Sequence, residues 1–575
     1  MFWVIKMIYS ENKNGFTFSF EGVAFEFKTN LKTQKKGEVY EIGVKENAPV
    51  PVLMAGDRII LPVDEGMVVY ADRDYVAGEL DIKNMGGDFS SREGTVGLVA
   101  IERSGKFLLI CPENGLHSGY SAVKTGELYD LSVYCKKEMK VFYGIYRSLK
   151  EMCDSYKKIK NVSARTLNEK IKAVPEAEKL IGGGKFWIWN DNYDEIMYSD
   201  HNCEENPNTG EALLDIADSL YNSGIKKAMF GIFFNGDSNS VEALYKKYGY
   251  IATQYDNYND VFNPAFLDIV PNNRVKNCDY TFRRMKDYPD GVQVDQNGSL
   301  WKAWALRGFD GKMHSQNTLC PVVAAQRMKE EIPEIIKEYP YYKGRYIDVY
   351  GGTISVCHSK EHPVTLDECL AVKKGAYKAI EEMGLIVGTE DGHELILDEI
   401  VYTEGMHSPV YFRINDAGRN HAHIYNEQQK EHIDRYMTDP SLRIPLWHLI
   451  YHDCLFTFPY WGDTTEMYPE RVKDKILFAC LYGCPPLYSF SVRHFKDYKD
   501  LIVESYKKIT FVTQKTATLP MTDYMVLNDD YTLQKTVFGD KYCVVANFSD
   551  KEMSYENFKV APKDYLFLCD GAEVK

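Results

Sequence analysis

The first 150 residues show the alternation of apolar and polar side chains that is typical of β-strands with one buried face. Phe16, Phe18 and Phe20 alternate with polar residues, and a Glu-Gly turn separates this run from a second alternating run. Many short strands separated by turn signals are typical of a sandwich. The pattern therefore predicts an N-terminal β-sandwich over residues 1–150.

The pattern changes three times further along the chain. Residues 151–182 are rich in charge and predict a helical connector. Over 183–512, short apolar runs alternate with helical periodicity, which predicts successive βαβ units and a parallel sheet. Residues 513–575 return to short strands and predict a small C-terminal β domain. The expected fold is an α/β protein in which a (β/α)8 TIM barrel is flanked by two β domains.

Eight apolar segments in the middle zone are candidates for the barrel strands. They span residues 185–192, 226–237, 248–260, 345–350, 385–390, 408–416, 444–453 and 484–490. Polar side chains recur at their C-terminal ends, including Asp191 at the end of the first segment and Asp256 and Asp260 at the end of the third. Active sites of β/α barrels lie at that rim, so these carboxylates become candidates for binding substrate.

One predicted βαβ unit carries a carboxylic acid at the end of each strand. The first strand leads to Asp348 and the second to Glu390, and the helix between them starts at a capping box formed by Thr365 and Glu368. The two strands of such a unit run parallel, so their C-terminal ends share one rim. Two carboxyls that face one pocket are the minimum equipment for hydrolysing a glycosidic bond. We therefore expect Asp348 and Glu390 to be the catalytic pair.

Charge and hydropathy argue against several other classes of function. The formal net charge is −15, whereas a protein that binds nucleic acid needs a basic surface for the phosphates. No segment reaches the ~18 apolar residues of a membrane span. The N-terminus lacks a basic region followed by a long apolar run, and the 13 cysteines show no disulfide spacing. We therefore expect a cytoplasmic protein with reduced thiols that binds neither nucleic acid nor membrane.

The sequence gives little support for a bound metal or cofactor. Cys357, His358 and His362 lie close together, but no CxxC pair completes a zinc motif, which argues against a zinc site. Glycines 182–184 precede a strand, whereas a phosphate-binding loop needs glycines between a strand and a helix. No cofactor is therefore required by the sequence, and the identity of any metal is open.

Four segments resemble a group of bacterial glycoside hydrolases. These are RYIDVYGG (345–352), HPVTLDE (362–368), GLIVGTEDG (384–392) and PLWHLIYHDCLFTFPYWGD (445–463). They are similar to families GH101 and GH129, the endo- and exo-acting α-N-acetylgalactosaminidases, and to their uncharacterised relatives, over about residues 180–500. The resemblance implies a barrel between two β domains, and some relatives carry calcium, which leaves room for a calcium ion here.

The resemblance also implies roles for the two acids. The acid after the fourth strand, Asp348, would be the nucleophile, and the acid after the fifth, Glu390, would be the acid/base of a retaining hydrolase. Their spacing, 390 − 348 = 42 residues, is longer than expected for the family, and we place the extra length in loop 351–363. This departure puts the contacts to substrate in doubt more than it does the catalytic pair.

The remaining candidates would shape a sugar pocket, and several alternatives stay open. Besides Asp256 and Asp260, the expected wall consists of His452, Asp453 and Asp463, with Trp461 as a stacking face. Glu394 or Glu404 could replace Glu390 as the acid/base. We expect exo-acting hydrolysis of an α-linked sugar, with N-acetylgalactosamine or galactose favoured. The alternatives are another α-linked sugar, or an inactive protein that only binds carbohydrate. The oligomeric state cannot be predicted.

Overall fold

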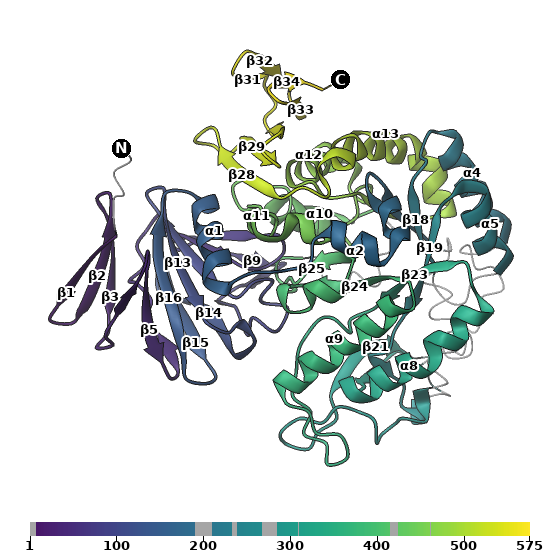
Figure 1. Ribbon diagram of the computed structural model, residues 1–575, viewed down its shortest axis with the longest axis horizontal. Helices are drawn as coiled ribbons and strands as arrows, with labels where there is room; N and C mark the ends of the chain where they lie inside the picture. The colour runs from purple at the N-terminus through teal and green to yellow at the C-terminus, as the bar shows by residue number, and fades with distance from the viewer. Residues whose placement is uncertain are drawn as a thin grey trace.

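The computed structural model describes residues 7–189, 210–232, 238–266, 269, 284–308, 310–413, 424–460 and 462–574. The N-terminal sheets lie on one side of a large α/β region, and the C-terminal strands pack on top of it (Figure 1). The predicted fold class is confirmed: a barrel of the TIM type is flanked by β-structure at both ends.

The N-terminal region contains the strands expected from its alternating pattern. They are β1 Ile8–Asn12, β2 Gly15–Phe20, β3 Val23–Lys28, β4 Gln34–Lys36, β5 Val39–Val44, β6 Asn47–Ala48, β7 Arg58–Leu61, β8 Met67–Tyr70, β9 Val76–Ala77, β10 Leu80–Asp81, β11 Asn84–Met85, β12 Val99–Arg103, β13 Lys106–Pro112, β14 Ser118–Thr125, β15 Leu128–Cys135 and β16 Met139–Tyr146. Within residues 7–189, the largest sheet has the order β4-β5-β16-β13-β12-β7-β8, and a second has the order β11-β14-β15-β6. Alternate side chains of both sheets fill one apolar core.

Two capped helices connect this region to the barrel. Helix α1 (Leu149–Lys160) begins at Ser148, whose hydroxyl accepts a hydrogen bond from the Glu151 amide. Helix α2 (Leu167–Ala173) begins at Thr166 with a complete capping box. The buried ammonium of Lys170 on α2 donates to the carbonyl oxygens of Leu397, Ile400 and Cys454 at 2.6–2.7 Å. These bonds fix α2 to loops that precede strands of the barrel.

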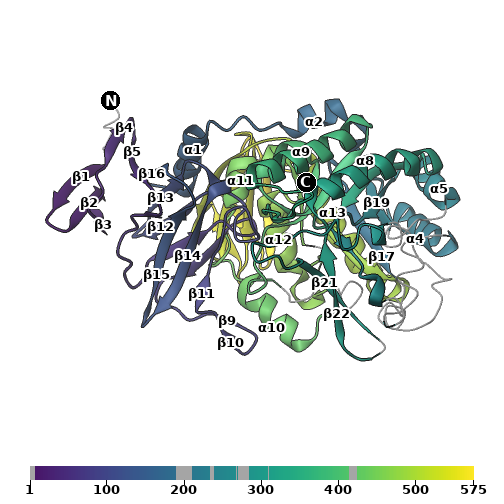
Figure 2. The same cartoon turned by 90° about the horizontal axis from the view of Figure 1, so that it is seen from below.

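Parallel strands form the barrel, with helices around it (Figures 1 and 2). Among the described residues the sheet has the order β26-β25-β24-β23-β19-β18-β17-β27 and is nearly closed. The elements are β17 Gly184–Trp189, α4 Gly210–Asn222, β18 Ala228–Ile232, α5 Ser238–Tyr248, β19 Ile251–Asp256, α8 Pro321–Glu338, β23 Tyr342–Ile347, α9 Leu366–Glu382, β24 Ile386–Gly392, β25 Tyr402–Met406, α10 Glu427–Tyr436, α11 Leu446–Tyr451, β26 Phe456–Phe458, α12 Val472–Tyr482, β27 Leu487–Ser491 and α13 Val492–Thr516. No helix among these residues is long and apolar enough to cross a bilayer.

Two of the predicted barrel strands are wrong. The sixth strand is β25 rather than 408–416, whose described part is a loop and a turn. The seventh is the short β26, and most of segment 444–453 forms α11. Every residue of α11 is buried, so its apolar run has no polar face. A short run that is buried all round does not distinguish a helix from a strand, which explains the error.

Smaller β elements extend from the barrel. The loop after β19 carries β20 (Asp260–Val261), which pairs with the hairpin of β21 (Lys302–Arg307) and β22 (Met313–Thr318); Figure 2 shows this hairpin projecting from the barrel. The C-terminal strands are β28 Met521–Val526, β29 Leu533–Phe538, β30 Tyr542–Asn547, β31 Met553–Tyr555, β32 Phe558–Val560, β33 Asp564–Cys569 and β34 Ala572–Glu573. Their main sheet packs against α12, so it stabilises the barrel from outside.

The barrel interior combines aromatic rings with one buried ion pair. Trp187, Tyr346 and Tyr402 belong to its apolar cluster. The ammonium of Lys185 contacts the carboxylate of Glu404 and lies 4.5–4.7 Å from the centres of those three rings. Both charged side chains are fully buried. Each ion therefore depends on the other for its stability in the barrel core.

We expect Lys185→Met to destabilise the barrel by about 3–5 kcal/mol, because the buried carboxylate of Glu404 would lose its counter-charge. Replacing both residues, Lys185→Met with Glu404→Leu, should recover much of this loss, because no unpaired charge would remain. Urea denaturation followed by tryptophan fluorescence measures both effects. Equal destabilisation by the single and double variants would show that packing, rather than charge, dominates at this position.

Candidate active site

Asp348 and Glu390 lie at equivalent positions on neighbouring strands. Ile347 at the end of β23 pairs with Thr389 in β24, so the next residue on each strand is one of the two acids. Tyr346 and Ile386 fill the barrel interior, and side chains alternate along a strand, so both acids point inward at the C-terminal rim. Both are buried, with exposures of 7% and 3%. The structure thus brings the predicted catalytic pair together.

Donors from the end of β19 and from the loop after it hold one oxygen of Asp348. The Tyr255 hydroxyl donates to Oδ2 at 2.6 Å, and the Asn257 amide lies 3.4 Å from the same oxygen. The other oxygen, Oδ1, has no hydrogen-bond partner among the described residues. Burial and the neighbouring charge of Glu390 raise the pKa of Asp348 well above its usual range, and the Tyr255 hydrogen bond opposes this rise. Two such carboxyls favour holding one proton between them.

We expect Tyr255→Phe to lower kcat/KM by about 10- to 100-fold, because a hydrogen bond to a charged group contributes about 1.5–3 kcal/mol. Tyr346→Phe is the matched control, since its inward ring neighbours Tyr255 and its hydroxyl has no partner among the described residues. Steady-state kinetics on an aryl glycoside compare the two variants. Similar rates for both would show that the bond from Tyr255 does not support catalysis.

A positively charged wall lies against Glu390. Arg92, from the N-terminal sandwich, pairs with Asp391 at 2.7 Å, and its guanidinium lies 3.6 Å from Glu390. Arg413 also contacts Asp391 at 3.1 Å and stacks 4.2 Å from the ring centre of Tyr460. These two cations lower the pKa of Asp391 despite its complete burial. The negative charge of Asp391 therefore compensates much of the positive charge of Arg92 and Arg413.

The backbone is strained directly after each acid. Val349 has a φ of 47° and Asp391 has a φ of 58°. A positive φ is unfavourable for a residue with a β-carbon, and most of all for a β-branched valine. Strain of this kind costs of order 1–3 kcal/mol and tends to occur at functional sites.

Of the carboxylates predicted after the third strand, one lies beside the pair and one does not. Asp260 accepts a hydrogen bond from the Asn257 amide at 2.9 Å, so Asn257 links it to Asp348. Asp256 instead forms a buried ion pair with Arg345 at 2.6 Å. Tyr255 points into the barrel, so its neighbour Asp256 points outward. The structure therefore does not place Asp256 beside Asp348 and Glu390, in contrast to the expectation from the sequence.

His452 and Asp453 lie at the other end of the barrel. They follow α11 and precede β26, whereas the two acids lie at the C-terminal ends of β23 and β24. The His452 ring bonds to the carbonyl oxygen of Leu519 at 2.7 Å and packs against Phe538, both from the C-terminal region. These two residues therefore do not line the site. Most of segment 444–453 is helix α11, which leads into the N-terminal end of β26, and it is not a strand whose C-terminal end reaches the rim.

The last candidates follow β26 and β17. Asp463 lies after β26 and contacts Lys475, and its carboxylate also accepts a hydrogen bond from Tyr425 at 2.9 Å. Asp463 therefore lies on the rim, but its carboxylate is bound by two side chains of the protein itself. Trp461 and Asp191 lie outside the residues that the structure describes.

The two alternative acids have structural partners. Glu394 accepts hydrogen bonds from the Gly97 amide and from the hydroxyls of Tyr156 and Tyr451, at 2.6–2.9 Å. Glu404 is the partner of Lys185 deeper in the barrel. Neither arrangement resembles an acid that faces a substrate, so Glu390 remains the best candidate.

The sequence analysis missed several neighbours of the pair. Strand parity could have identified Tyr255, because alternate residues of β19 face the interior. Asn257 lies two residues further on and could have been found with it. Arg92 could not be anticipated, because it reaches the site from another domain. Arg413 and Tyr460 were missed because they follow β25 and β26, and the sequence analysis placed the sixth and seventh strands elsewhere.

The described side chains offer two clusters that could bind a metal. They are Cys320–Cys357–His362 and Glu65–His448–Cys484, and each contains a thiol. Calcium prefers oxygen ligands, so neither is a set of the kind that it takes. No step at the candidate site is therefore assigned to calcium.

A β/α barrel with two buried carboxyls at its C-terminal rim has the features of a glycoside hydrolase. A sequence model of glycosyl hydrolases related to the GH101 family, GH129, matches residues 219–537, more than half of the chain. The chain therefore belongs to family GH129. A comparison with curated protein sequences gave no match.

Solved structures share the fold over nearly the whole chain. Ligand-free α-N-acetylgalactosaminidase NagBb from Bifidobacterium bifidum aligns with a TM-score of 0.66 at 14% identity, covering 94% of this chain and 97% of that one. Its GalNAc complex gives 0.65 at 14%, covering 98% and 91%. The α-galactosidase TtGalA from Thermus thermophilus, in complex with p-nitrophenyl α-D-galactopyranoside, gives 0.51 at 11%, covering 94% and 99%. These likenesses establish a common architecture.

Proposed function

We propose that this protein is a retaining, exo-acting glycoside hydrolase that cleaves an α-linked terminal N-acetylgalactosamine or galactose. One observation carries the proposal: Asp348 and Glu390 follow paired positions of adjacent strands, point to the same side and are buried together. Two acids in that relation can both reach one sugar ring, one as the nucleophile and the other as the acid/base.

Asp348 acts as the nucleophile. Its Oδ2 is held by Tyr255 and Asn257, and Oδ1 is the oxygen that attacks the anomeric carbon. As the new C–O bond forms, the glycosidic bond breaks, and Glu390 gives its proton to the leaving oxygen. Glu390 then removes a proton from water, which attacks the anomeric carbon and releases Asp348. The proton taken from water replaces the one that Glu390 gave to the leaving oxygen, so the enzyme ends the cycle unchanged.

The pair must begin with its single proton on Glu390. Two donors point at Asp348, and donors favour the charged form of a carboxyl. Arg92 is closer to Asp391 than to Glu390, so its charge is balanced mainly by Asp391. The proposed mechanism therefore places the single proton on Glu390 and the negative charge on Asp348.

Strand spacing supports retention of configuration. Neighbouring strands lie about 4.7–4.9 Å apart, and in-register side chains on them are separated by a similar distance. Retaining glycosidases hold their carboxyls about 5–5.5 Å apart, whereas inverting enzymes need about 6.5–9.5 Å to accommodate water. We infer exo action from the Arg92, Asp391 and Arg413 side chains beside Glu390, which would leave less room there for an internal sugar than for a chain end.

The choice of sugar follows the family and the named activities of the structures that share its fold. A panel of p-nitrophenyl glycosides, α- and β-linked, tests it directly. Proton NMR during the first minutes identifies the anomer released. We expect hydrolysis of the α-GalNAc or α-galactosyl member with the α-anomer formed first. Initial release of the β-anomer would exclude retention, and sugar binding without turnover would favour an inactive binding protein.

A further inference from the structure

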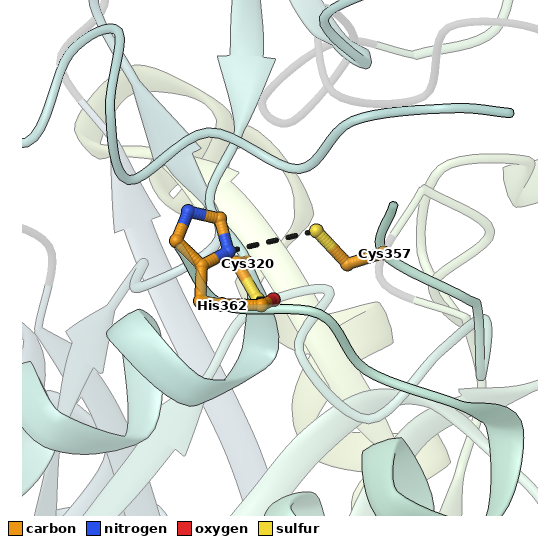
Figure 3. Close-up of side chains that lie close together, drawn as sticks. All are labelled: Cys320, Cys357 and His362. Carbon is orange, nitrogen blue, oxygen red and sulfur yellow. Dashed lines mark hydrogen bonds between the residues drawn. The ribbon is translucent and has the colours of Figure 1, made fainter. Parts of the chain in front are cut away.

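We propose that Cys320, Cys357 and His362 form a binding site for a thiophilic divalent cation, with zinc as the leading ion. The ligand atoms of the three side chains all lie within 4.8 Å of one another, and Figure 3 shows the His362 ring directed at Cys357 with Cys320 beside it. Two cysteines and a histidine are a common protein ligand set for zinc. This inference does not depend on the proposed hydrolysis.

The separation of two of the ligand atoms fits a tetrahedral ion. The Cys357 sulfur and His362 Nδ1 are 3.6 Å apart. With Zn–S of about 2.3 Å and Zn–N of about 2.0–2.1 Å, two ligands at the tetrahedral angle are separated by about 3.6 Å. The two atoms therefore already have the spacing that a shared zinc ion requires.

The histidine is oriented as a metal ligand. Its Nε2 lies 2.6 Å from the carbonyl oxygen of Asp290, which can only accept a hydrogen bond, so Nε2 carries the proton. Nδ1 is then the unprotonated nitrogen, and its lone pair points at Cys357. A ligating histidine almost always donates its other N–H to a carbonyl or carboxylate in this way.

Backbone groups support the two sulfurs. The Val294 amide donates a hydrogen bond to the Cys357 sulfur at 3.5 Å, which helps to orient that side chain. Cys320 occupies the N-cap position of the 18-residue helix α8, and burial together with the neighbouring Cys357 raises the pKa of its thiol, so the thiol keeps its proton until a metal replaces it. Without metal, the Cys320 thiol can donate to the His362 carbonyl oxygen at 3.6 Å. Metal binding would release the thiol protons to solvent.

The cluster joins segments that shape the rim of the barrel. Cys357 and His362 lie in the loop after β23, which begins at Asp348, and Cys320 precedes α8. Two backbone hydrogen bonds between Cys357 and Val364 close that loop into a hairpin that contains His362. A bound ion would therefore tie the long loop 349–365 to the start of α8.

The second thiol-containing cluster is a weaker candidate. Glu65, His448 and Cys484 are all buried, and Glu65 already forms an ion pair with Arg443. A cation there would compete with that guanidinium. His362, in contrast, is partly exposed, which gives an ion a path from solvent.

Metal loading of the full-length protein tests the inference. Protein purified with reductant is stripped with a chelator, dialysed against zinc or cobalt, and analysed by elemental mass spectrometry and absorption spectroscopy. We expect one ion per chain, and for cobalt a thiolate-to-metal charge-transfer band with the strong visible bands of tetrahedral coordination. A loaded wild-type protein without the thiolate band would overturn the proposal whatever the variants do.

Variants locate the ion. Cys357→Ser and His362→Gln should each weaken zinc binding by roughly 100-fold or more, since loss of a ligand exceeds the 10- to 100-fold effect of a supporting group. Cys369→Ser, a buried thiol of the same apolar cluster, and His358→Gln, an exposed neighbour, are the matched controls and should bind as wild type. Unchanged affinity in Cys357→Ser, or a Cys320–Cys357 disulfide under the reducing loading conditions, would contradict the site.

Discussion

Asp348→Asn is expected to lower kcat by on the order of 10⁴-fold or more on any glycoside that the wild-type protein cleaves, because the amide cannot form the covalent intermediate. Substrate binding should persist, since the asparagine keeps the shape of the side chain and its contact with Tyr255. Steady-state kinetics with an aryl α-glycoside, together with binding measured by calorimetry, separate the two effects.

The stability of this variant provides an internal control. The folded-state pKa of Asp348 is raised above its unfolded value, so the stability that the group contributes at low pH is lost as pH rises through the folded pKa. At neutral pH the variant removes a carboxyl whose ionisation is opposed mainly by its burial, and its unfolding temperature should equal or exceed that of wild type. Retention of wild-type turnover by a folded Asp348→Asn protein would disprove the assignment of the nucleophile.

Glu390→Gln should lower kcat/KM by about 10²- to 10⁴-fold for substrates whose leaving group needs a proton. The loss should be much smaller for p-nitrophenyl glycosides, because nitrophenolate leaves without protonation. The wild-type pH profile should fall on its alkaline side as the acid loses its proton, and the variant should lack that limb.

Azide supplies a second readout for Glu390. In the proposed mechanism, Glu390 activates water once the glycosyl-enzyme has formed, whereas azide needs no base. Added azide should therefore accelerate turnover of a nitrophenyl substrate by Glu390→Gln and yield the glycosyl azide. Asp391→Asn is a useful comparison, because its carboxylate balances Arg92 and Arg413 without facing the bond to be broken. An alkaline limb that survives in Glu390→Gln would assign the proton donor to another group.

The parts of the fold that could be predicted are those encoded by local periodicity. The alternation around Phe18 and the capping box at Thr365 gave the first β domain and the helix of the central βαβ unit. The predictions of the sixth and seventh strands were wrong for a physical reason. Segment 444–453 is apolar on all sides because α11 is buried on all sides, and β26 has only three residues, too few to show any period.

Part of the candidate site could likewise be predicted from local sequence, and part could not. The proximity of Asp348 and Glu390 was predictable because both acids come from one supersecondary unit whose geometry is fixed by parallel pairing. Asp256 was misjudged because a side chain's direction depends on strand parity, which one residue of register reverses. Arg92 and the Cys320 contribution to the thiol cluster depend on contacts between segments far apart in the chain, which no local pattern reveals.

Trapping of the covalent intermediate tests the central claim most directly. The protein is incubated with the 5-fluoro α-glycosyl fluoride of whichever sugar it cleaves, digested, and analysed by peptide mass mapping. Our account predicts one glycosyl adduct, on the peptide that contains Asp348, and no adduct in Asp348→Asn. A label on any other carboxylate, with Asp348 unmodified, would contradict it.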